Sequence, residues 1–338
     1  MNANPVAQPA PWRVGLSRRR WLQLCGLSAA SSALATPAHA AADRTLRLVV
    51  PFPPGGTSDI LSRVMAAQWG AALHETVVID NKPGAGGSLG ADAVARADAD
   101  GATLLMGHTG TLAVNPSLYP KLSYDPLKSF IPVALVARVP NVLVVNAQRG
   151  PRTLKELIAR AQAARGQLSY SSGGNGSAAH IAFEYLKLVA HFSMLHVPYR
   201  GTALSVTDLI AGQVDATFTG APAVMPHVKS GRLRALAVSS RTRLAAFPDV
   251  PTVAESGYAG FEADQWYGIV APAATPSARV AQLNELINRS LALAEVRTQF
   301  AAEGALPAPG SAKAFADLIA SEIPRWREVV RAGNVTLE

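Results

Sequence analysis

Short apolar runs alternate with segments of helical spacing from about residue 45 to the end of the chain. The run LRLVVPF at 46–52 is rich in β-branched residues and predicts a strand, whereas residues 57–73 place apolar side chains at helical spacing. The same reading predicts further strands at 76–80, 103–107, 131–139, 141–146, 168–172, 193–199, 214–219, 233–240 and 261–272. It predicts further helices at 88–97, 153–165, 177–191, 202–211, 276–293, 294–303 and 311–332. Strands that alternate with helices in this way are typical of parallel sheets in an α/β fold.

The order of these elements predicts two domains. The last three helices follow the final strand and have no strands of their own, so we expect them to pack against the N-terminal sheet. This arrangement gives a discontinuous first domain, residues 43–143 plus 267–338, and an inserted second domain, residues 144–266. Two chain crossings between α/β domains favour a hinge and a central ligand cleft, as in periplasmic binding proteins.

The first forty residues have the features of an export signal. Residues 1–40 contain four arginines and no acidic residue, followed by a weakly apolar run at 21–35 and the small-x-small sequence Ala38-His39-Ala40. The sequence Arg18-Arg19-Arg20-Trp21-Leu22 favours a twin-arginine signal, and the general secretory route is the alternative. The apolar run is too short for a membrane anchor. Cleavage near Ala40 predicts a soluble periplasmic product.

Composition narrows the classes of function. The chain has 338 residues, of which 49% are hydrophobic and 16% charged, which excludes a disordered protein. The net charge of +8 suggests a nucleic acid or an anionic membrane as partner. Removal of the predicted signal would halve that charge and remove the only cysteine, leaving no basic cluster and no thiol chemistry. The histidines show no metal-ligand spacing, and no dinucleotide or phosphate-binding motif is complete, so we expect no metal, no cofactor and no nucleic acid.

Glycine-rich and hydroxyl-rich loops follow the predicted strands, where ligands bind in open α/β sheets. Glycines let the backbone approach a ligand closely, and free N–H groups at a helix start bind anions without a charged side chain. Five such loops facing one cleft would suit a small carboxylate. The alternative is that they are ordinary turns with helix caps. The candidate ligand-binding residues are Phe52, Gly55, Gly56, Thr57, Ser58, Asp59, Gly84, Ala85, Gly86, Gly87, His108, Thr109, Thr111, Ser171, Ser172, Asn175, Ser177, Tyr199, Arg200, Gly201, Thr202, Ala203 and Trp266.

Several single residues have two interpretations. Trp266 forms either a wall of the cleft or part of the core, and its place near a domain crossing favours the wall. Arg200 is either a carboxylate clamp or a solvated surface residue. Asp59 is more typical of a helix cap than of a ligand contact. Ser177 and His180 would suit an exported hydrolase, but no third catalytic partner is evident.

Long segments of the chain resemble one known family. LRLVVPFPPGGTSDILSR, VVIDNKPGAGGSLGADAVARA, LSYSSGGNGSAAH and VPYRGTALSVTDLIAGQVD are similar to the Bug family of periplasmic solute-binding proteins, and the match runs from about residue 44 to 335. The resemblance implies a two-domain Venus-flytrap fold, type II-like, that captures a dicarboxylate, tricarboxylate, aromatic acid or acidic amino acid. It also implies delivery of that ligand by a monomer to a two-component permease, the large and small membrane subunits of a tripartite tricarboxylate transporter.

The resemblance also places the family's binding loops on this sequence. They fall on residues 52–59, 84–88, 107–111, 171–177 and 199–203, and on the segment after Asp215. His108 and the sequence Thr217-Phe218-Thr219-Gly220 depart from the family pattern and leave the identity of the ligand open. A sensory protein that presents its closed form to a receptor kinase remains an alternative, because it needs the same ligand-bound state.

Overall fold

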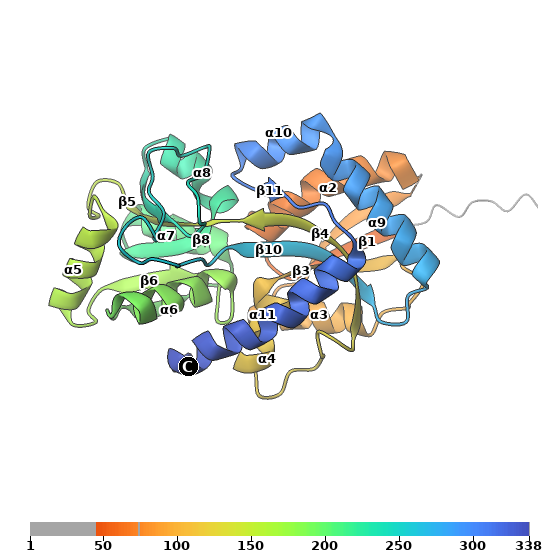
Figure 1. Cartoon of the computed structure of the whole chain (residues 1–338), viewed down its shortest axis with the longest axis horizontal. Helices are drawn as coiled ribbons and strands as arrows, with labels where there is room; N and C mark the ends of the chain where they lie inside the picture. The colour runs from red at the N-terminus through yellow and green to blue at the C-terminus, as the bar shows by residue number, and fades with distance from the viewer. Residues whose placement is uncertain (1–44, 74, 338) are drawn as a thin grey trace, which may run out of the picture. The chain divides into compact units, whose positions relative to one another are not determined.

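The computed structural model describes residues 45–73 and 75–337. The predicted export signal at 1–40 lies outside this range. Two sheets form the framework (Figure 1). The strands of the first sheet are, in spatial order, β11 (Leu306–Pro307), β4 (Phe130–Val139), β10 (Gln265–Pro272), β3 (Thr103–His108), β1 (Thr45–Val50) and β2 (Thr76–Asn81). Those of the second sheet are β7 (Leu195–Pro198), β6 (Ser169–Ser172), β8 (Ala216–Gly220), β5 (Asn141–Asn146) and β9 (Leu233–Val238).

Both sheets are mixed, which corrects the expectation of parallel sheets. Strand β1 is parallel to β2 and β3, and β6 is parallel to β7 and β8, as the strand–helix alternation predicts. Strand β10 is antiparallel to β3 and β4, and β5 is antiparallel to β8 and β9. Strand β5 follows β4 of the other sheet after Pro140 alone, and β10 follows β9 of the other sheet after residues 239–264, which contain no helix. A crossover helix, which forces a parallel return, is therefore not required at these points.

The chain crosses between the sheets twice. Pro140 alone separates β4 from β5, and residues 261–264 lead from the second sheet into β10 (Figure 1). The changes of sheet therefore fall close to the boundaries predicted at 143/144 and 266/267. The exact division into domains remains a prediction.

The helices cover the faces of these sheets. Their bounds are α2 (Thr57–Leu73), α3 (Ser88–Ala95), α4 (Asn115–Leu118), α5 (Leu154–Ala164), α6 (Ala178–Ala190), α7 (Thr202–Ala211), α8 (Ala221–Lys229), α9 (Ser277–Ala292), α10 (Ala294–Ala302) and α11 (Ala312–Ala332). Helices α9 and α11 both contact β4, so the C-terminal helices pack on the first sheet as expected. Helix α8 was not predicted, because Pro222 and Pro226 interrupt a helical reading of its sequence.

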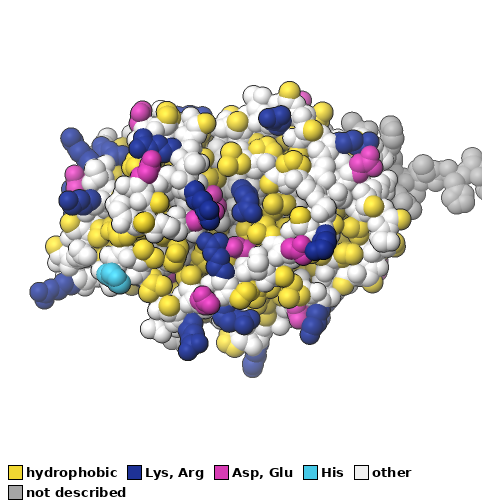
Figure 2. Space-filling model, in the orientation of Figure 1, with side chains coloured by type: hydrophobic (Ala, Val, Ile, Leu, Met, Phe, Trp, Pro, Cys, Tyr) yellow, Lys and Arg dark blue, Asp and Glu magenta, His cyan; other side chains and the backbone are white. Residues whose placement is uncertain are grey.

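Side chains from widely separated segments share the core of the first sheet. Leu61, Met65 and Trp69 of α2 are buried together with Ile287 of α9 and Phe300 of α10. Each fully buried side chain of this size stabilises the fold by roughly 1.5–3 kcal/mol relative to exposure. Of the helices within the described residues, none has the length and apolar character to cross a lipid bilayer. On the face drawn in Figure 2, basic and acidic side chains lie interspersed among apolar ones.

Candidate functional site

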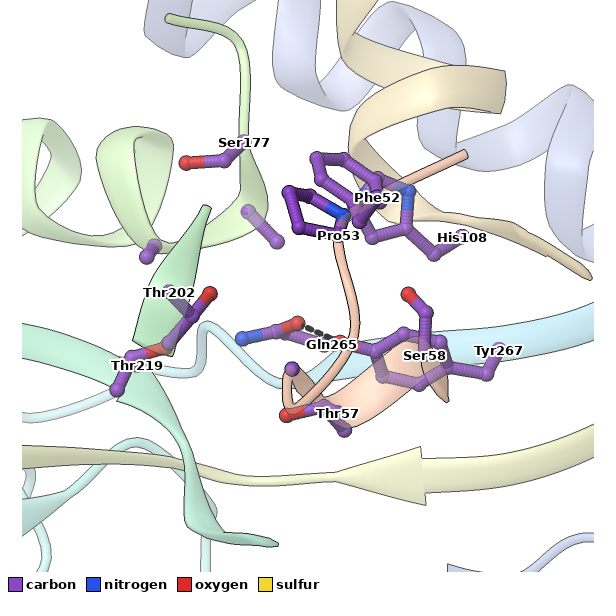
Figure 3. A pocket seen from close by; sticks show the side chains of 13 residues that line it. Phe52, Pro53, Thr57, Ser58, His108, Ser177, Thr202, Thr219, Gln265 and Tyr267 are labelled. Atoms are coloured by element: carbon purple, nitrogen blue, oxygen red, sulfur yellow. Dashed lines mark hydrogen bonds between the residues drawn. The ribbon is translucent and has the colours of Figure 1, made fainter. Parts of the chain in front are cut away.

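A small cavity lies where loops of the two sheets meet, and we call it the inner cavity (Figure 3). Its volume is about 30 Å³, on the order of the share of one water molecule in the liquid. Most of its polar side chains carry hydroxyl groups, and none of the described residues that line it is Asp, Glu, Lys or Arg. The lining residues are Phe52, Pro53, Gly56, Thr57, Ser58, His108, Ser177, Ala178, Ala179, Thr202, Thr219, Gln265 and Tyr267.

Four helices begin at the inner cavity. Thr57 and Ser58 open α2, Ser177 is the N-cap of α6, Thr202 opens α7, and Thr219 stands two residues before α8. Each helix N-terminus carries a partial positive charge of roughly half an elementary charge and has N–H groups without intrahelical partners. Their convergence gives the cavity a positive potential without a cationic side chain. An anionic group is therefore the ligand that this environment favours.

A second, larger space adjoins the first, and we call it the outer cavity. Its volume is about 580 Å³, and it shares Phe52 and Pro53 with the inner cavity. It is also formed by both sheets, through loops that follow β2, β6 and β7. The lining residues are Phe52, Pro53, Pro83, Gly84, Ala85, Gly86, Gly87, Tyr119, Gly173, Gly174, Asn175, Pro198, Tyr199, Arg200 and Gly201.

The loops of the two sheets touch across these cavities. The hydroxyl of Tyr119 donates a hydrogen bond to the carbonyl of Asn175 over 3.2 Å. The side-chain amide of Asn175 donates to the carbonyl of Leu337 near the C-terminus over 2.6 Å. A Cβ placed on Gly86 would lie 2.7 Å from the Asn175 carbonyl oxygen, which is closer than atoms can pack. Glycine at this position permits the contact, and the structure represents a closed arrangement of the two sides.

His108 presents a neutral N–H donor at the inner cavity. Its ring packs between Phe52 and Tyr267, with centroid separations of 4.8 and 5.6 Å. The backbone N–H of Thr111 donates to Nδ1 over 3.1 Å, so Nδ1 is the unprotonated nitrogen and the proton of the neutral ring is on Nε2. Complete burial lowers the pKa of His108 to about 3. The ring is therefore uncharged at neutral pH.

A chain of hydrogen bonds joins the inner cavity to the interdomain crossings. The Tyr267 hydroxyl donates to Oε1 of the Gln265 side chain, and the Gln265 side-chain amide donates to the side-chain oxygen of Asn141. Asn141 in turn donates to the carbonyl of Ala263 over 2.6 Å, and its backbone N–H donates to Ser239 over 2.8 Å. One buried asparagine thus ties both crossing segments together. Among the polar lining residues of the cavity, Gln265 and Tyr267 were absent from the sequence-based candidates, whereas Thr219 lies in the segment after Asp215 where the resemblance placed a binding loop.

Trp266 does not form a wall of either cavity, which corrects the favoured interpretation. It is 1% exposed, its ring lies edge-on to Phe315, and its Nε1 donates to Glu322 over 3.1 Å. Successive side chains of a strand point to opposite faces. Gln265 and Tyr267 therefore face the cavity, while Trp266 faces the core between β10 and α11. The sequence predicted this strand correctly, but it predicted the wrong face of the strand to point towards the cavity.

Several other candidates line neither cavity and instead make hydrogen bonds or packing contacts within the protein. Asp59 accepts hydrogen bonds from the Gly55 N–H, Asn81 and Arg63, which fix the loop after β1. These hydrogen bonds lower the pKa of Asp59 although its burial acts in the opposite direction. The candidates outside both linings are Gly55, Asp59, Thr109, Thr111, Ser171, Ser172, Ala203 and Trp266. The remaining candidates line the inner cavity, the outer cavity or both.

The hydroxyls among these supporting residues have internal partners. The Thr111 hydroxyl donates to the backbone carbonyl of His108, and the Thr109 hydroxyl accepts from the backbone N–H of Trp266. The Ser171 hydroxyl accepts from that of Ser205 over 2.7 Å. The Ser172 hydroxyl lies 2.7 Å from Nε2 of His196 and accepts from the Gly174 N–H. These bonds hold the loops in the conformation that lets other atoms face the cavities.

Ser177 and His180 do not form a nucleophile–base pair. The Ser177 hydroxyl accepts a hydrogen bond from the backbone N–H of His180 over 3.3 Å, as a helix cap does. Nδ1 of His180 accepts from the Gly176 N–H over 3.2 Å, and its ring stacks on His196 with a centroid separation of 3.9 Å. The geometry gives these two residues a structural part in the 173–177 loop.

We expect the buried histidines to make the fold sensitive to acid. Burial lowers the pKa of His108 and of His196 to about 3 and that of His180 to about 4. As pH falls below about 6.5, the unfolded chain binds protons that the folded chain does not, so each histidine removes up to about 1.4 kcal/mol of stability per pH unit. Urea unfolding between about pH 7 and about pH 5 should show this loss.

The dependence of the unfolding free energy on pH, measured in variants, shows which histidines are responsible. His108→Asn should flatten it, whereas His191→Gln, at an exposed position, should not. Asp264 acts in the opposite sense, because burial raises its carboxyl pKa to about 6 and stability is gained as pH falls from there towards about 4. An unfolding free energy that stays constant or rises on acidification would contradict the assignment.

Comparison with known proteins places this geometry in a family. Residues 61–335 match the family described as tripartite tricarboxylate transporter family receptor. Protein BugT of Bordetella pertussis is 38% identical over 326 residues, which cover 96% of this chain and 100% of the relative. A protein encoded in the tcbD–tcbE intergenic region of a Pseudomonas species is 38% identical over 95% of this chain and 96% of its own length.

Solved structures agree in fold. A structure from R. palustris with adipate is 34% identical, has a TM-score of 0.84, and is matched over 87% of this chain and 98% of its own. MatC from Rhodopseudomonas palustris with bound malate is 35% identical, with a TM-score of 0.81 and coverage of 85% and 99%. The periplasmic binding protein BugD is 34% identical, with a TM-score of 0.83 and coverage of 87% and 99%. The two-sheet fold with its interdomain cavities, together with these matches, shows that the chain belongs to the tripartite tricarboxylate transporter receptors, the Bug family of periplasmic solute-binding proteins.

Proposed function

We propose that this protein captures a small carboxylate between its two domains in the periplasm and delivers it to a two-component membrane permease. Export by the predicted twin-arginine signal, with cleavage near Ala40, is part of this proposal. Capture occurs by binding, without chemical change of the ligand. The two R. palustris relatives solved with adipate and malate support a carboxylate as the class of ligand.

The convergence of helix N-termini on the inner cavity carries the proposal. Thr57, Ser58, Thr202 and Thr219 supply hydroxyls beside the N-termini of α2, α7 and α8. The Nε2–H of His108 adds a neutral donor. The two oxygens of a carboxylate offer about four acceptor sites for donors of this kind. A cation would meet no acidic side chain among the described lining residues.

Binding and closure are linked in this arrangement. Thr57 and Tyr267 belong to the first sheet's side of the inner cavity, whereas Thr202 and Thr219 belong to the second sheet's side. A carboxylate that contacts both sides therefore binds the closed arrangement better than an open one and shifts the population towards it. The hydrogen-bond chain from Tyr267 to Asn141 connects the occupied cavity to the hinge. The closed form is the state that the permease would recognise.

A thermal-shift screen tests the proposal. The protein is unfolded, refolded and shown by mass spectrometry to hold no co-purified ligand, and is then heated with succinate, malate, citrate, adipate, glutamate or benzoate. A ligand at about a hundred times its Kd adds about 2.7 kcal/mol, so a true ligand should raise the Tm by roughly 5–10 °C. A panel in which every acid leaves the Tm unchanged would contradict carboxylate capture.

Thr57→Val should weaken binding of the best acid by about tenfold, because it removes one hydrogen bond to a charged group while keeping the shape of the side chain. Thr57 is 5% exposed and opens α2 at the inner cavity. Isothermal titration calorimetry measures the change. Thr207→Val, at an exposed position of α7, is the matched control and should bind as the unmodified protein does. Equal affinity for both variants would move the carboxylate away from Thr57.

A further inference from the structure

The inner cavity holds only one end of a ligand in the closed arrangement. Its volume of about 30 Å³ is on the order of one water molecule, whereas pockets that enclose whole small molecules span about 300–1,000 Å³. The outer cavity has about 580 Å³ and shares the Phe52–Pro53 wall with the inner one. The body of a ligand whose carboxylate enters the inner cavity does not fit there, and the outer cavity offers adjacent space along this wall.

The walls of the outer cavity differ in chemistry from those of the inner cavity. The rings of Phe52, Tyr119 and Tyr199 and three prolines provide apolar surface, and glycines bring bare backbone to the space. The hydroxyls of Tyr119 and Tyr199 are engaged with Asn175 and Asp208, which orients both rings. Such surfaces favour an apolar or aromatic ligand body over a compact polar one.

Arg200 is the single charged residue among the described residues that line the outer cavity. It is exposed, follows β7, and forms no ion pair or hydrogen bond with another described residue through its side chain. A guanidinium binds a carboxylate through two parallel hydrogen bonds, and a free one keeps all of its donors for a ligand. The outer cavity thus combines an apolar wall with a cation at its rim.

We propose that the two cavities form one bipartite site for an elongated dicarboxylate, with one carboxylate in the inner cavity, an apolar or aromatic spacer along Phe52, and the second carboxylate on Arg200. This proposal rests on the proposed function and narrows its ligand class. A short diacid such as succinate places one carboxylate in the inner cavity but does not reach Arg200 with the other. A longer one such as adipate, suberate or terephthalate reaches both cavities.

The bipartite site is tested by calorimetric titration of the whole protein without its predicted signal. The acids compared differ from one another in a single feature, either length or the second carboxylate. Succinate, adipate and suberate vary in length, and hexanoate keeps the six-carbon body of adipate but lacks the second carboxylate. We expect the longer diacids to bind at least about tenfold more tightly than succinate, and adipate about tenfold more tightly than hexanoate.

The variant Arg200→Gln should reduce the adipate-to-hexanoate affinity ratio to near unity. A purely structural role of Arg200 would lower both affinities together and leave their ratio unchanged. Arg297→Gln, at an exposed position of α10 outside both cavities, is the matched control and should keep the ratio.

The outcomes separate this proposal from the one on which it rests. Equal affinity for succinate and adipate, or an unchanged ratio in Arg200→Gln, would overturn the bipartite site while leaving carboxylate capture intact. Failure of every acid, including hexanoate, to bind the unmodified protein would overturn both proposals.

Discussion

Replacing Gly220 with alanine should raise the Kd of the carboxylate ligand by roughly tenfold to a hundredfold. A Cβ at this position would lie 2.6 Å from Oγ1 of Thr57 and 3.4 Å from the amide nitrogen of Gln265. Gly220 belongs to β8 of the second sheet and has a φ of −54°, which alanine adopts without strain. Thr57 and Gln265 belong to the other side. The overlap therefore arises only on closure, and overpacking of this kind costs about 1–3 kcal/mol.

The ligand-free stability of this variant separates closure from folding. If the ligand-free protein is open, Gly220→Ala should unfold at the same temperature as the unmodified protein while its affinity falls. Gly310→Ala is the matched control, because its added Cβ meets no atom within 4 Å, and both its affinity and its Tm should stay unchanged. Unchanged affinity in Gly220→Ala would show that the ligand does not bind the closed arrangement.

Replacing Asn141 with leucine should lower the Tm by roughly 10 °C. Asn141 is fully buried, donates to the Ala263 carbonyl and accepts from the Gln265 amide. Leucine has a similar size but leaves both partners buried without hydrogen bonds, at about 1–3 kcal/mol each. For a chain of this length each kcal/mol corresponds to roughly 2–4 °C. Thermal denaturation followed by circular dichroism measures the change.

The same variant should also bind ligand less tightly, because the Gln265 amide loses the partner that orients it towards the cavity. Gln148→Ala serves as the control, since Gln148 lies exposed just after β5 and its backbone, not its side chain, makes the local hydrogen bond. A shift of the Tm no larger than that of the control would mean that Asn141 does not tie the two crossings together.

The strands and the glycine-rich loops that follow them were predictable from the sequence. The apolar runs predict the strands. In each domain the loops at the carboxyl ends of parallel strands lie at one edge of the sheet, where ligands bind. Because both edges were expected to face one cleft, residues as distant as Thr57 and Thr202 were expected to lie there together. The structure brings both to the inner cavity. The antiparallel strands were not foreseen, because the same apolar run suits either direction. Direction depends on where the chain crosses between sheets.

The sequence did not predict which side chains of β10 point towards the cavity. Alternation along 265–267 places Gln265 and Tyr267 on one face and Trp266 on the other, but the pattern does not say which face meets the ligand. All three are buried, so exposure gives no contrast along the strand. The place of Trp266 near a domain crossing suggested a wall, whereas its packing on Phe315 and its hydrogen bond to Glu322 place it in the core.

A similar limit applies within the loops. Ser172 and Thr57 are both hydroxyl residues in candidate loops, yet Ser172 bonds to His196 while Thr57 lines the inner cavity. The loop sequence predicts a ligand site, but the direction of each side chain depends on partners far away in the chain. His196 lies 24 residues from Ser172, and no local pattern connects them.

The most direct test of the central claim compares an acid with its uncharged analogue. Adipate and its diamide, adipamide, have the same length and nearly the same shape, but only adipate carries the negative charge that the converging helix N-termini favour. Calorimetric titration of ligand-free protein should show one adipate bound per chain and adipamide at least about a hundredfold weaker. Equal binding of the two compounds, or binding of adipamide alone, would contradict the assignment of the interdomain cavity as a carboxylate site.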